Sequence, residues 1–225
     1  MRTKPILIFD LDGTLFDSNG QIFEAVNSVR NDFGKPFISI IELTKHIGLP
    51  AEKLFEDLEL SESELNEIVF AFRENLRTKI AIGNVVFATV TRFVNLAVDL
   101  GFVACIATSK PQDLAELVIV GSEIAGKFSV IAGTGTLRPK PFPDVIQKCL
   151  DESGGSFGIM FGDRIEDIQA AINANIASIG IAQGVHSESD LLNAGANLVF
   201  PNFEKILNEC LSFPGGPDAY FQELC

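Results

Sequence analysis

Basic residues and long apolar runs are both scarce in this sequence. Its 17 lysines and arginines stand against 30 aspartates and glutamates, giving a formal net charge of −13. That balance argues against binding to nucleic acid or to an anionic membrane surface. No apolar run approaches the roughly 20 residues that a membrane-spanning helix needs, and the apolar segment after Arg2 and Lys4 is too short for a secretory signal. We therefore expect a cytoplasmic protein without nucleic-acid or membrane partners.

Cysteines are also few, and their spacing argues against two kinds of site. Cys105, Cys149, Cys210 and Cys225 form no Cys-x-x-Cys pair or similar cluster, so neither a disulfide framework nor a zinc site is supported. Cys105 lies in an apolar stretch, where a buried free thiol is common. With 225 residues, 47% of them hydrophobic, the chain is long enough for one large domain or for one domain with an insert.

The most informative segment is short and lies near the N-terminus. Residues 6–9 form an apolar run, Ile-Leu-Ile-Phe, that is typical of a buried strand, and Gly13 breaks it. Asp10 and Asp12 therefore leave the strand at its carboxyl end, where open α/β sheets bind ligands. In different environments, one carboxylate can attack or hold a cation while the other moves a proton.

The segment from about residue 18 to residue 82 contains helical patterns and no convincing strand. Apolar residues recur there at helical spacing, and Ser61 begins a Ser-x-x-Glu capping box with Glu64. The expected helices cover about residues 21–33, 40–47, 51–58 and 61–76. We interpret residues 18–82 as an all-helical insert.

From Gly83 onward, predicted strands alternate with helices, which is the pattern of a doubly wound parallel sheet. The expected strands lie at residues 102–107, 129–132, 158–161, 178–181 and 198–200. The expected helices lie at about residues 86–100, 165–173 and 203–211, and a further helix ends at about residue 150. The predicted core domain is residues 1–17 and 83–211. Residues 212–225 contain two prolines and two glycines and are expected to be a flexible or loosely docked C-terminal tail.

Polar side chains follow three of the later strands. The sequence places Thr108, Ser109 and Lys110 after the strand at 102–107, Lys140 in the loop after the next strand, and Asp163 and Asp167 after the strand at 158–161. Hydroxyls and loop amides can receive phosphate oxygens. Hard carboxylate oxygens suit Mg²⁺, which binds through one or two carboxylates together with substrate phosphate and water.

Taken in order, these motifs resemble those of the haloacid dehalogenase-like hydrolases. Asp10-Leu11-Asp12-Gly13-Thr14 resembles the first motif of that family, Thr108-Ser109-Lys110 the second, Lys140-Pro141-x-Pro143-Asp144 the lysine motif, and Gly162-Asp163-x-x-x-Asp167 the fourth. The match covers nearly the whole chain. It implies an α/β fold with a Rossmann-like, doubly wound parallel sheet, and the insert resembles the α-helical cap of these enzymes.

The resemblance also implies catalytic roles. Asp10 would be the nucleophile that takes the phosphoryl group as an aspartyl-phosphate, and Asp12 would protonate the leaving oxygen and later activate water. Thr108 and Lys140 would complete the catalytic set, with Lys140 neutralising charge between nucleophile and phosphate. The residues expected to hold the substrate phosphate are Gly13, Thr14, Thr108, Ser109 and Lys140.

A magnesium site is implied by the same resemblance. Its ligands would be Asp10, the backbone carbonyl of Asp12, and Asp163. Asp167 would hold either the metal shell or Lys140 in place.

Asp12 narrows the type of reaction. Haloacid dehalogenases in the strict sense and phosphonoacetaldehyde hydrolases lack an acid at this position, because their substrates have no phosphate ester oxygen to protonate. Asp12 therefore favours a phosphate ester of a small metabolite. Thr14, segment 108–110 and segment 47–50 resemble the phosphoglycolate phosphatase branch. A β-phosphoglucomutase-like phosphomutase or phosphotransferase, and a non-catalytic binder of a phosphorylated ligand, stay as alternatives, and the sequence does not indicate the oligomeric state.

Several basic residues outside the assigned roles have two interpretations. Lys110 lies close enough to the motifs to act on a phosphate, or is an ordinary loop cation. Arg164 stands where many relatives have Ser or Thr, and either adds positive charge near the phosphate or points to solvent. Arg73 in the insert either reaches an anionic substrate or, as we expect, lies on a solvated helix face. His46 and His186 have no partner at ligand spacing, so we expect surface or structural roles.

Overall fold

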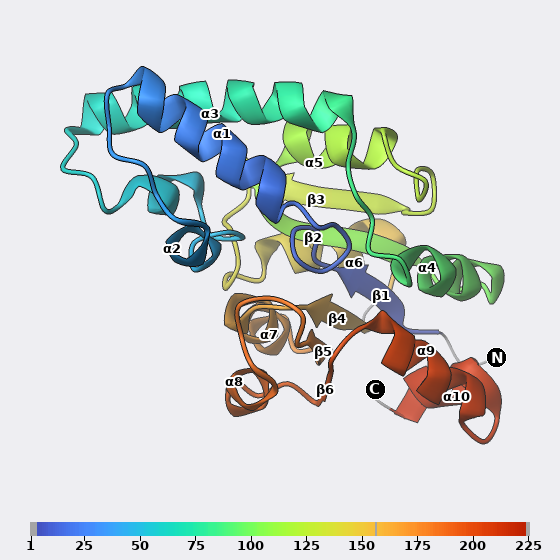
Figure 1. The fold of residues 1–225 in the computed structure, drawn as a ribbon. Coiled ribbons are helices and arrows are strands. Elements are labelled where there is room, and N and C mark those ends of the chain that lie inside the picture. The colour runs from blue at the N-terminus through green and yellow to red at the C-terminus, as the bar shows by residue number, and fades with distance from the viewer. Residues whose placement is uncertain (1–3, 156, 224–225) are drawn as a thin grey trace.

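The computed structural model describes residues 4–155 and 157–223, and its centre is a six-stranded parallel sheet (Figure 1). The strands are β1 (Ile6–Phe9), β2 (Ala104–Pro111), β3 (Val130–Thr134), β4 (Gly158–Gly162), β5 (Ala177–Ile181) and β6 (Leu198–Phe200). Their order across the sheet is β3-β2-β1-β4-β5-β6. The chain order therefore reverses at β1, and open α/β sheets bind ligands in the crevice at such a point. The predicted doubly wound parallel sheet is confirmed.

Helices cover both faces of this sheet. They are α4 (Val90–Asp99), α5 (Gln112–Val120), α6 (Asp144–Ser153), α7 (Ile165–Asn173), α8 (Glu188–Asn193), α9 (Phe203–Ser212) and α10 (Gly216–Glu223). Because side chains alternate along a strand, Ile6 and Ile8 pack in one cluster with α6 and α7, while Leu7 and Phe9 pack in the other with α4 and α9. None of the described helices combines the length and apolar character that crossing a membrane requires.

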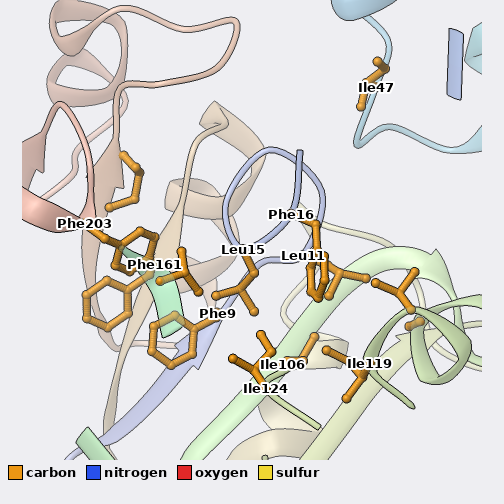
Figure 2. Close-up of a cluster of buried hydrophobic side chains, with 14 of the residues drawn as sticks. Phe9, Leu11, Leu15, Phe16, Ile47, Ile106, Ile119, Ile124, Phe161 and Phe203 are labelled. Atoms are coloured by element: carbon orange, nitrogen blue, oxygen red, sulfur yellow. The ribbon is translucent and has the colours of Figure 1, made fainter. Parts of the chain in front are cut away.

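A cluster of phenylalanines lies directly before the carboxyl end of β1 (Figure 2). Phe9 of β1 stacks on Phe161 of β4, with 4.8 Å between ring centroids. Phe93 of α4 and Phe203 of α9 pack against both rings. Asp10 follows Phe9 in the chain, so this apolar packing holds the start of the first motif in place.

The expectation of a flexible or loosely docked tail at residues 212–225 is wrong for the part that the structure describes. Residues 216–223 form α10, which packs on α9. Phe221 is 2% exposed and makes edge contacts with Phe93 and Phe102. Burial of this ring stabilises the helix despite the prolines and glycines before it. Residues 224–225 lie outside the described part of the chain.

Four helices lie within the predicted insert, and we call them the cap helices: α1 (Asn19–Asp32), α2 (Ile40–Thr44), the 3₁₀ helix η1 (Ala51–Phe55) and α3 (Glu62–Ile82). No strand occurs between residues 18 and 82, all of which are described. Figure 1 shows α1 lying along α3. The capping box predicted at Ser61 and Glu64 is present. The helices expected at 40–47 and 51–58 are shorter than predicted, and turns follow both of them. After α2 the N–H groups of Lys45 and His46 bond to carbonyls three residues back, as in a turn.

Two paired segments connect the cap helices to the sheet. The Asp17 N–H donates to the Val85 carbonyl at 2.9 Å, and the Phe87 N–H donates to the Leu15 carbonyl at 3.1 Å. Phe16 and Val86 form an antiparallel bridge between these bonds. The chain therefore leaves and re-enters the core through two segments that are hydrogen-bonded to each other.

Phe221→Ala tests the docking of α10. Removing a buried phenylalanine ring costs about 3–5 kcal/mol of unfolding free energy, so we expect a loss of about 3 kcal/mol in urea denaturation. The matched control is Phe70→Ala on α3, whose side chain is 68% exposed and whose loss should be within about 0.5 kcal/mol. Equal effects of the two substitutions would restore the view of a loosely docked tail.

Candidate active site

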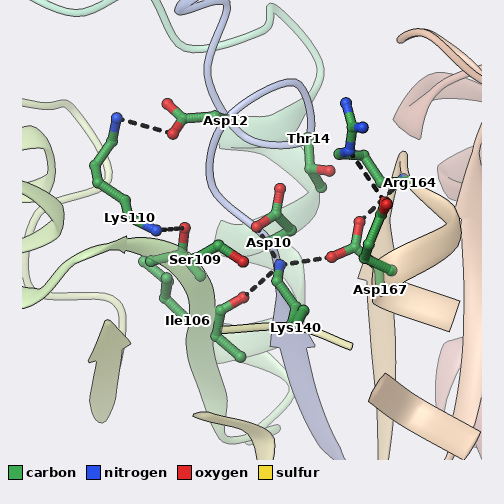
Figure 3. Close-up of polar contacts among 12 residues, drawn as sticks. Asp10, Asp12, Thr14, Ile106, Ser109, Lys110, Lys140, Arg164 and Asp167 are labelled. Atoms are coloured by element: carbon green, nitrogen blue, oxygen red, sulfur yellow. Dashed lines mark hydrogen bonds and ion pairs between the residues drawn. The ribbon is translucent and has the colours of Figure 1, made fainter. Parts of the chain in front are cut away.

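The predicted motif residues meet at the carboxyl ends of β1, β2 and β4 (Figure 3). Asp10 and Asp12 follow β1, Thr108 and Ser109 lie in the second half of β2, and Asp163 follows β4. These strands are neighbours in the sheet and parallel, so their carboxyl ends share one edge. The Asp10 N–H donates to the Phe161 carbonyl at 2.8 Å, which continues the strand pairing into the site.

Lys140 lies at the centre of this group. Its ammonium contacts the Asp10 carboxylate, lies 2.5 Å from an Asp167 oxygen, and donates to the Ala107 carbonyl at 2.9 Å. The side chain is buried, which by itself would lower its pKa, but the charges of Asp10 and Asp167 outweigh that effect and raise the pKa of Lys140. Lys140 is therefore a permanent cation with all three donors engaged.

Three buried carboxylates could hold a metal ion beside Lys140. One oxygen each from Asp10, Asp163 and Asp167 lies within 4.8 Å of the others. Burial raises the pKa of Asp10 to about 7, an effect that Lys140 opposes and Asp167 reinforces. Burial and the nearby Asp10 charge raise the pKa of Asp163 well above its ordinary value. Three carboxylates facing one lysine leave an excess of negative charge, and hard oxygen donors in that arrangement fit a divalent cation such as Mg²⁺.

The hydrogen bonds distinguish the three carboxylates. Asp167 uses one oxygen for Lys140 and the other for the Arg164 N–H at 3.0 Å. Asp10 and Asp163 each keep one oxygen for which no hydrogen bond occurs among the described residues. Asp10 and Asp163 are therefore the better candidates for direct metal ligands, and Asp167 is placed to orient Lys140.

Gly13 and Thr14 hold Asp163 in position. Gly13 has φ of +84°, and a Cβ there would lie 2.7 Å from an Asp163 oxygen, so both its conformation and the close approach require glycine. The Thr14 hydroxyl donates to the other Asp163 oxygen at 3.0 Å. Gln183, which sequence reasoning missed, donates its amide to the Gly13 and Thr14 carbonyls at 2.9 and 3.2 Å. No local motif marked Gln183, since it reaches the turn from beyond β5.

Asp12 points away from the carboxylate cluster and pairs with Lys110 at 2.8 Å. Both side chains are buried, so Lys110 belongs to the site rather than to an ordinary solvated loop. The second Asp12 oxygen and the Ser109 hydroxyl are buried with no hydrogen-bond partner among residues 4–155 and 157–223. The Thr108 hydroxyl accepts the Lys110 N–H at 3.2 Å. Buried polar atoms without partners are rare, and here they mark a place for polar groups of a ligand.

Arg164 does not point to solvent, which corrects one of the two interpretations drawn from the sequence. Its positive charge opposes the rise in the pKa of Asp163, so added positive charge near the phosphate stays a prediction. Arg164 is 5% exposed, and its guanidinium donates to the carbonyls of Lys45 and Ile47 in the cap segment after α2. A Cβ at Gly48 would lie 2.7 Å from the Arg164 side chain. Its own N–H donates to Asp167. Arg164 therefore connects the carboxylate cluster to the cap helices.

Lys140→Met tests the charge balance of the cluster. In the folded chain the pKa of Asp10 lies near 7, which is above its value in the unfolded chain. Protonation of Asp10 therefore stabilises the folded chain at low pH, and this stabilisation is lost as the pH rises through about 7. Without the Lys140 ammonium, the loss of stability on raising the pH should be larger. We expect the unfolding free energy to fall by about 3–5 kcal/mol at pH 8 and by less at pH 5, measured by urea denaturation. Lys205→Met, at an exposed lysine, is the control, and equal losses at both pH values would contradict the charge argument.

Arg164→Met tests the connection to the cap. The carbonyls of Lys45 and Ile47 would lose their donors, and a hydrogen bond of about 1–1.5 kcal/mol corresponds to roughly tenfold faster local opening. We expect amides of residues 46–49 to exchange hydrogen about tenfold faster, measured by mass spectrometry. Arg92→Met, at an exposed residue of α4, should leave that segment unchanged. Unaltered exchange in the Arg164 variant would show that the contact does not hold the segment.

Comparison with known proteins gives the same family that the motifs indicate. A family model described as haloacid dehalogenase-like hydrolase matches residues 7–181. A phosphoglycolate phosphatase of Colwellia psychrerythraea is 28% identical, with 92% of this chain and 97% of that protein covered. A 5'-nucleotidase of Pseudomonas aeruginosa is 30% identical, with coverage of 83% and 86%.

A solved structure supports the same family. The crystal structure of a predicted phosphatase from Clostridium acetobutylicum superposes with a TM-score of 0.83 at 28% identity, covering 94% of this chain and all of that one. Motifs, sheet order and relatives therefore lead to one conclusion. The chain belongs to the haloacid dehalogenase-like hydrolase family.

Proposed function

We propose that this enzyme is a magnesium-dependent phosphatase that hydrolyses a small phosphorylated metabolite through an aspartyl-phosphate intermediate. The observation that carries the proposal is the pairing of two different carboxylates at the end of β1. Asp10 lies among carboxylates against Lys140, whereas Asp12 faces away with one oxygen unpartnered. A nucleophile and an acid need such separate environments. Relatives named phosphatases support the reaction type, and the sequence supports a cytoplasmic location.

The metal site would use the oxygens that the structure leaves open. Asp10 and Asp163 would bind Mg²⁺ directly, with the backbone carbonyl of Asp12 as a further ligand. Asp167 would contribute through its hold on Lys140. When bound, Mg²⁺ would neutralise charge on the phosphoryl group.

In the first step, the Asp10 oxygen that contacts Lys140 attacks phosphorus while the bond from phosphorus to the ester oxygen breaks, which leaves the open Asp10 oxygen for Mg²⁺. Asp12 gives its proton to that departing oxygen. Lys140 orients the attacking oxygen and offsets charge next to the phosphate. The Ser109 hydroxyl, which has no partner in the described part of the chain, and Thr108 would hold phosphate oxygens.

In the second step, water attacks phosphorus of the aspartyl-phosphate, and the bond from phosphorus to Asp10 breaks. Asp12, now ionised, takes the proton from the water. Inorganic phosphate leaves, and both carboxylates return to their starting forms. Lys110 contacts only one Asp12 oxygen, so the other is free to take this proton.

Asp10→Asn tests the proposal by phosphate release from a panel of phosphorylated metabolites that includes phosphoglycolate. Wild type should release phosphate with Mg²⁺ and not after chelation, and the variant should lose at least about 10³-fold in kcat, because it removes the nucleophile. Asp99→Asn, at an exposed residue of α4, is the control and should keep full activity. Release that survives in Asp10→Asn, or needs no metal, would overturn the mechanism, and transfer of the phosphoryl group to a sugar phosphate would indicate a mutase.

A further inference from the structure

A cavity of about 360 Å³ lies between the cap helices and the core, beside Asp12. The core side of its wall includes Ser109 and Lys110, next to the proposed phosphate position. The cap side includes residues of α1, η1 and α3. A group bonded to a phosphate held at Ser109 would therefore extend into this cavity.

The walls of this cavity are mainly apolar. The cap helices contribute Ile22, Leu54, Phe72 and Leu76, and α5 contributes Leu114. All five side chains are at most 5% exposed in the folded chain. Surfaces of this kind favour an organic group that gives up little hydration on binding.

Every basic side chain of the cavity wall already faces an acid. Lys110 pairs with Asp12 at 2.8 Å, His46 lies 3.3 Å from Glu56, and Arg73 lies 3.6 Å from Glu52. When Asp12 carries the proton that the proposed reaction needs, Lys110 faces the phosphate position beside Ser109 instead, and His46 and Arg73 keep their acids. The cavity therefore has no surplus positive charge for a second anionic group of a substrate. A carboxylate such as that of glycolate would enter without an unpaired cation to receive it.

Unpartnered polar atoms distinguish this cavity from its neighbour. Asp12, Ser109 and Arg73 of its wall each have a buried polar atom for which the described residues offer no hydrogen-bond partner. A second cavity of about 310 Å³ opens on the other side of Asp12, beside Asp163 and Arg164. Among the described residues of that second wall, the buried side chains with an unpartnered polar atom are Asp12 and Asp163, whose carboxylates already have roles in the proposed reaction and metal site. The first cavity is thus the better place for the organic part of a substrate, and the Arg73 Nε is an N–H donor of its wall with no partner among the described residues.

We propose that the substrate is a phosphate monoester of an uncharged, largely apolar alcohol of at least ring size, with one hydrogen-bond acceptor that meets Arg73. This rests on the proposed phosphatase function. A water molecule takes about 30 Å³, so a two-carbon acid would leave most of the 360 Å³ filled with water. The cavity instead has the volume of sites that bury ring-sized ligands.

The first test uses the unmodified enzyme with Mg²⁺ and a series of ethyl, butyl and hexyl phosphate, together with benzyl phosphate and phosphoglycolate. The alkyl alcohols are leaving groups of similar intrinsic reactivity, so kcat/KM reports burial of the chain. We expect kcat/KM to rise about fourfold for each methylene buried. Benzyl phosphate should exceed phosphoglycolate by at least about tenfold.

A charge introduced into the wall provides the second test. Leu76→Arg adds an unpaired cation to the cavity and should raise the phosphoglycolate-to-hexyl phosphate ratio of kcat/KM at least about tenfold. Phe70→Arg is the matched control, because Phe70 lies on the same helix but is 68% exposed and should keep the wild-type ratio. The substrate series on the unmodified enzyme decides the question even where Leu76→Arg fails to fold.

The outcomes separate this inference from the proposed function. If kcat/KM does not change along the alkyl phosphates and phosphoglycolate is the better substrate, the proposal of an apolar leaving group is wrong. The proposed phosphatase function would still hold. No phosphate release from any ester in the presence of Mg²⁺ would overturn the phosphatase and the substrate class with it. A rise in kcat/KM along the alkyl phosphates, together with a higher phosphoglycolate-to-hexyl phosphate ratio in Leu76→Arg, would support both the phosphatase function and the apolar substrate class.

Discussion

The ammonium of Lys140 is the contact on which the arrangement at the strand ends depends. Parallel strands bring Asp10, Asp163 and Asp167 together in a buried place, where burial disfavours their charged forms. Lys140 offsets part of that cost and is fixed by three acceptors, including the Ala107 carbonyl. One positive charge cannot balance three carboxylates. The remaining negative charge is the physical basis for proposing a metal ion at the same edge of the sheet.

The cap helices complete the site from the opposite side, and several contacts hold them against the core. They include the hydrogen-bonded connections near Leu15 and Val85, Arg164 with the carbonyls of Lys45 and Ile47, and the packing of α3 on α5. The cavity wall comes from both parts, so its shape depends on how the cap helices are placed. Relatives of this chain carry names with different substrates on one family fold, which is consistent with reaction chemistry in the core and selection in the cap.

Much of the fold could be predicted because buried parallel strands appear in a sequence as short apolar runs with turn residues after them. The runs at 158–161 and 198–200 show this, since both strands lie within a residue of the expected positions. The prediction for residues 212–225 was wrong because composition reports local flexibility, whereas Phe221 is held by rings more than a hundred residues away. Helix α8 was missed although Ser187 and Asp190 form a capping box at its start, because the helix is short. The boundaries of the insert and the roles of the site residues stay predictions.

The sequence by itself determined the family, the order of the strands along the chain and the set of acids, hydroxyls and lysine that meet at one edge. It did so because a polar residue placed after a buried strand must emerge at the end of that strand. Only the tertiary structure decided which of these groups contact one another: Lys110 with Asp12, Thr14 and Gln183 around Asp163, and Arg164 with the cap. Those pairs join elements far apart in sequence. Their geometry depends on how helices and strands pack, which local spacing does not encode.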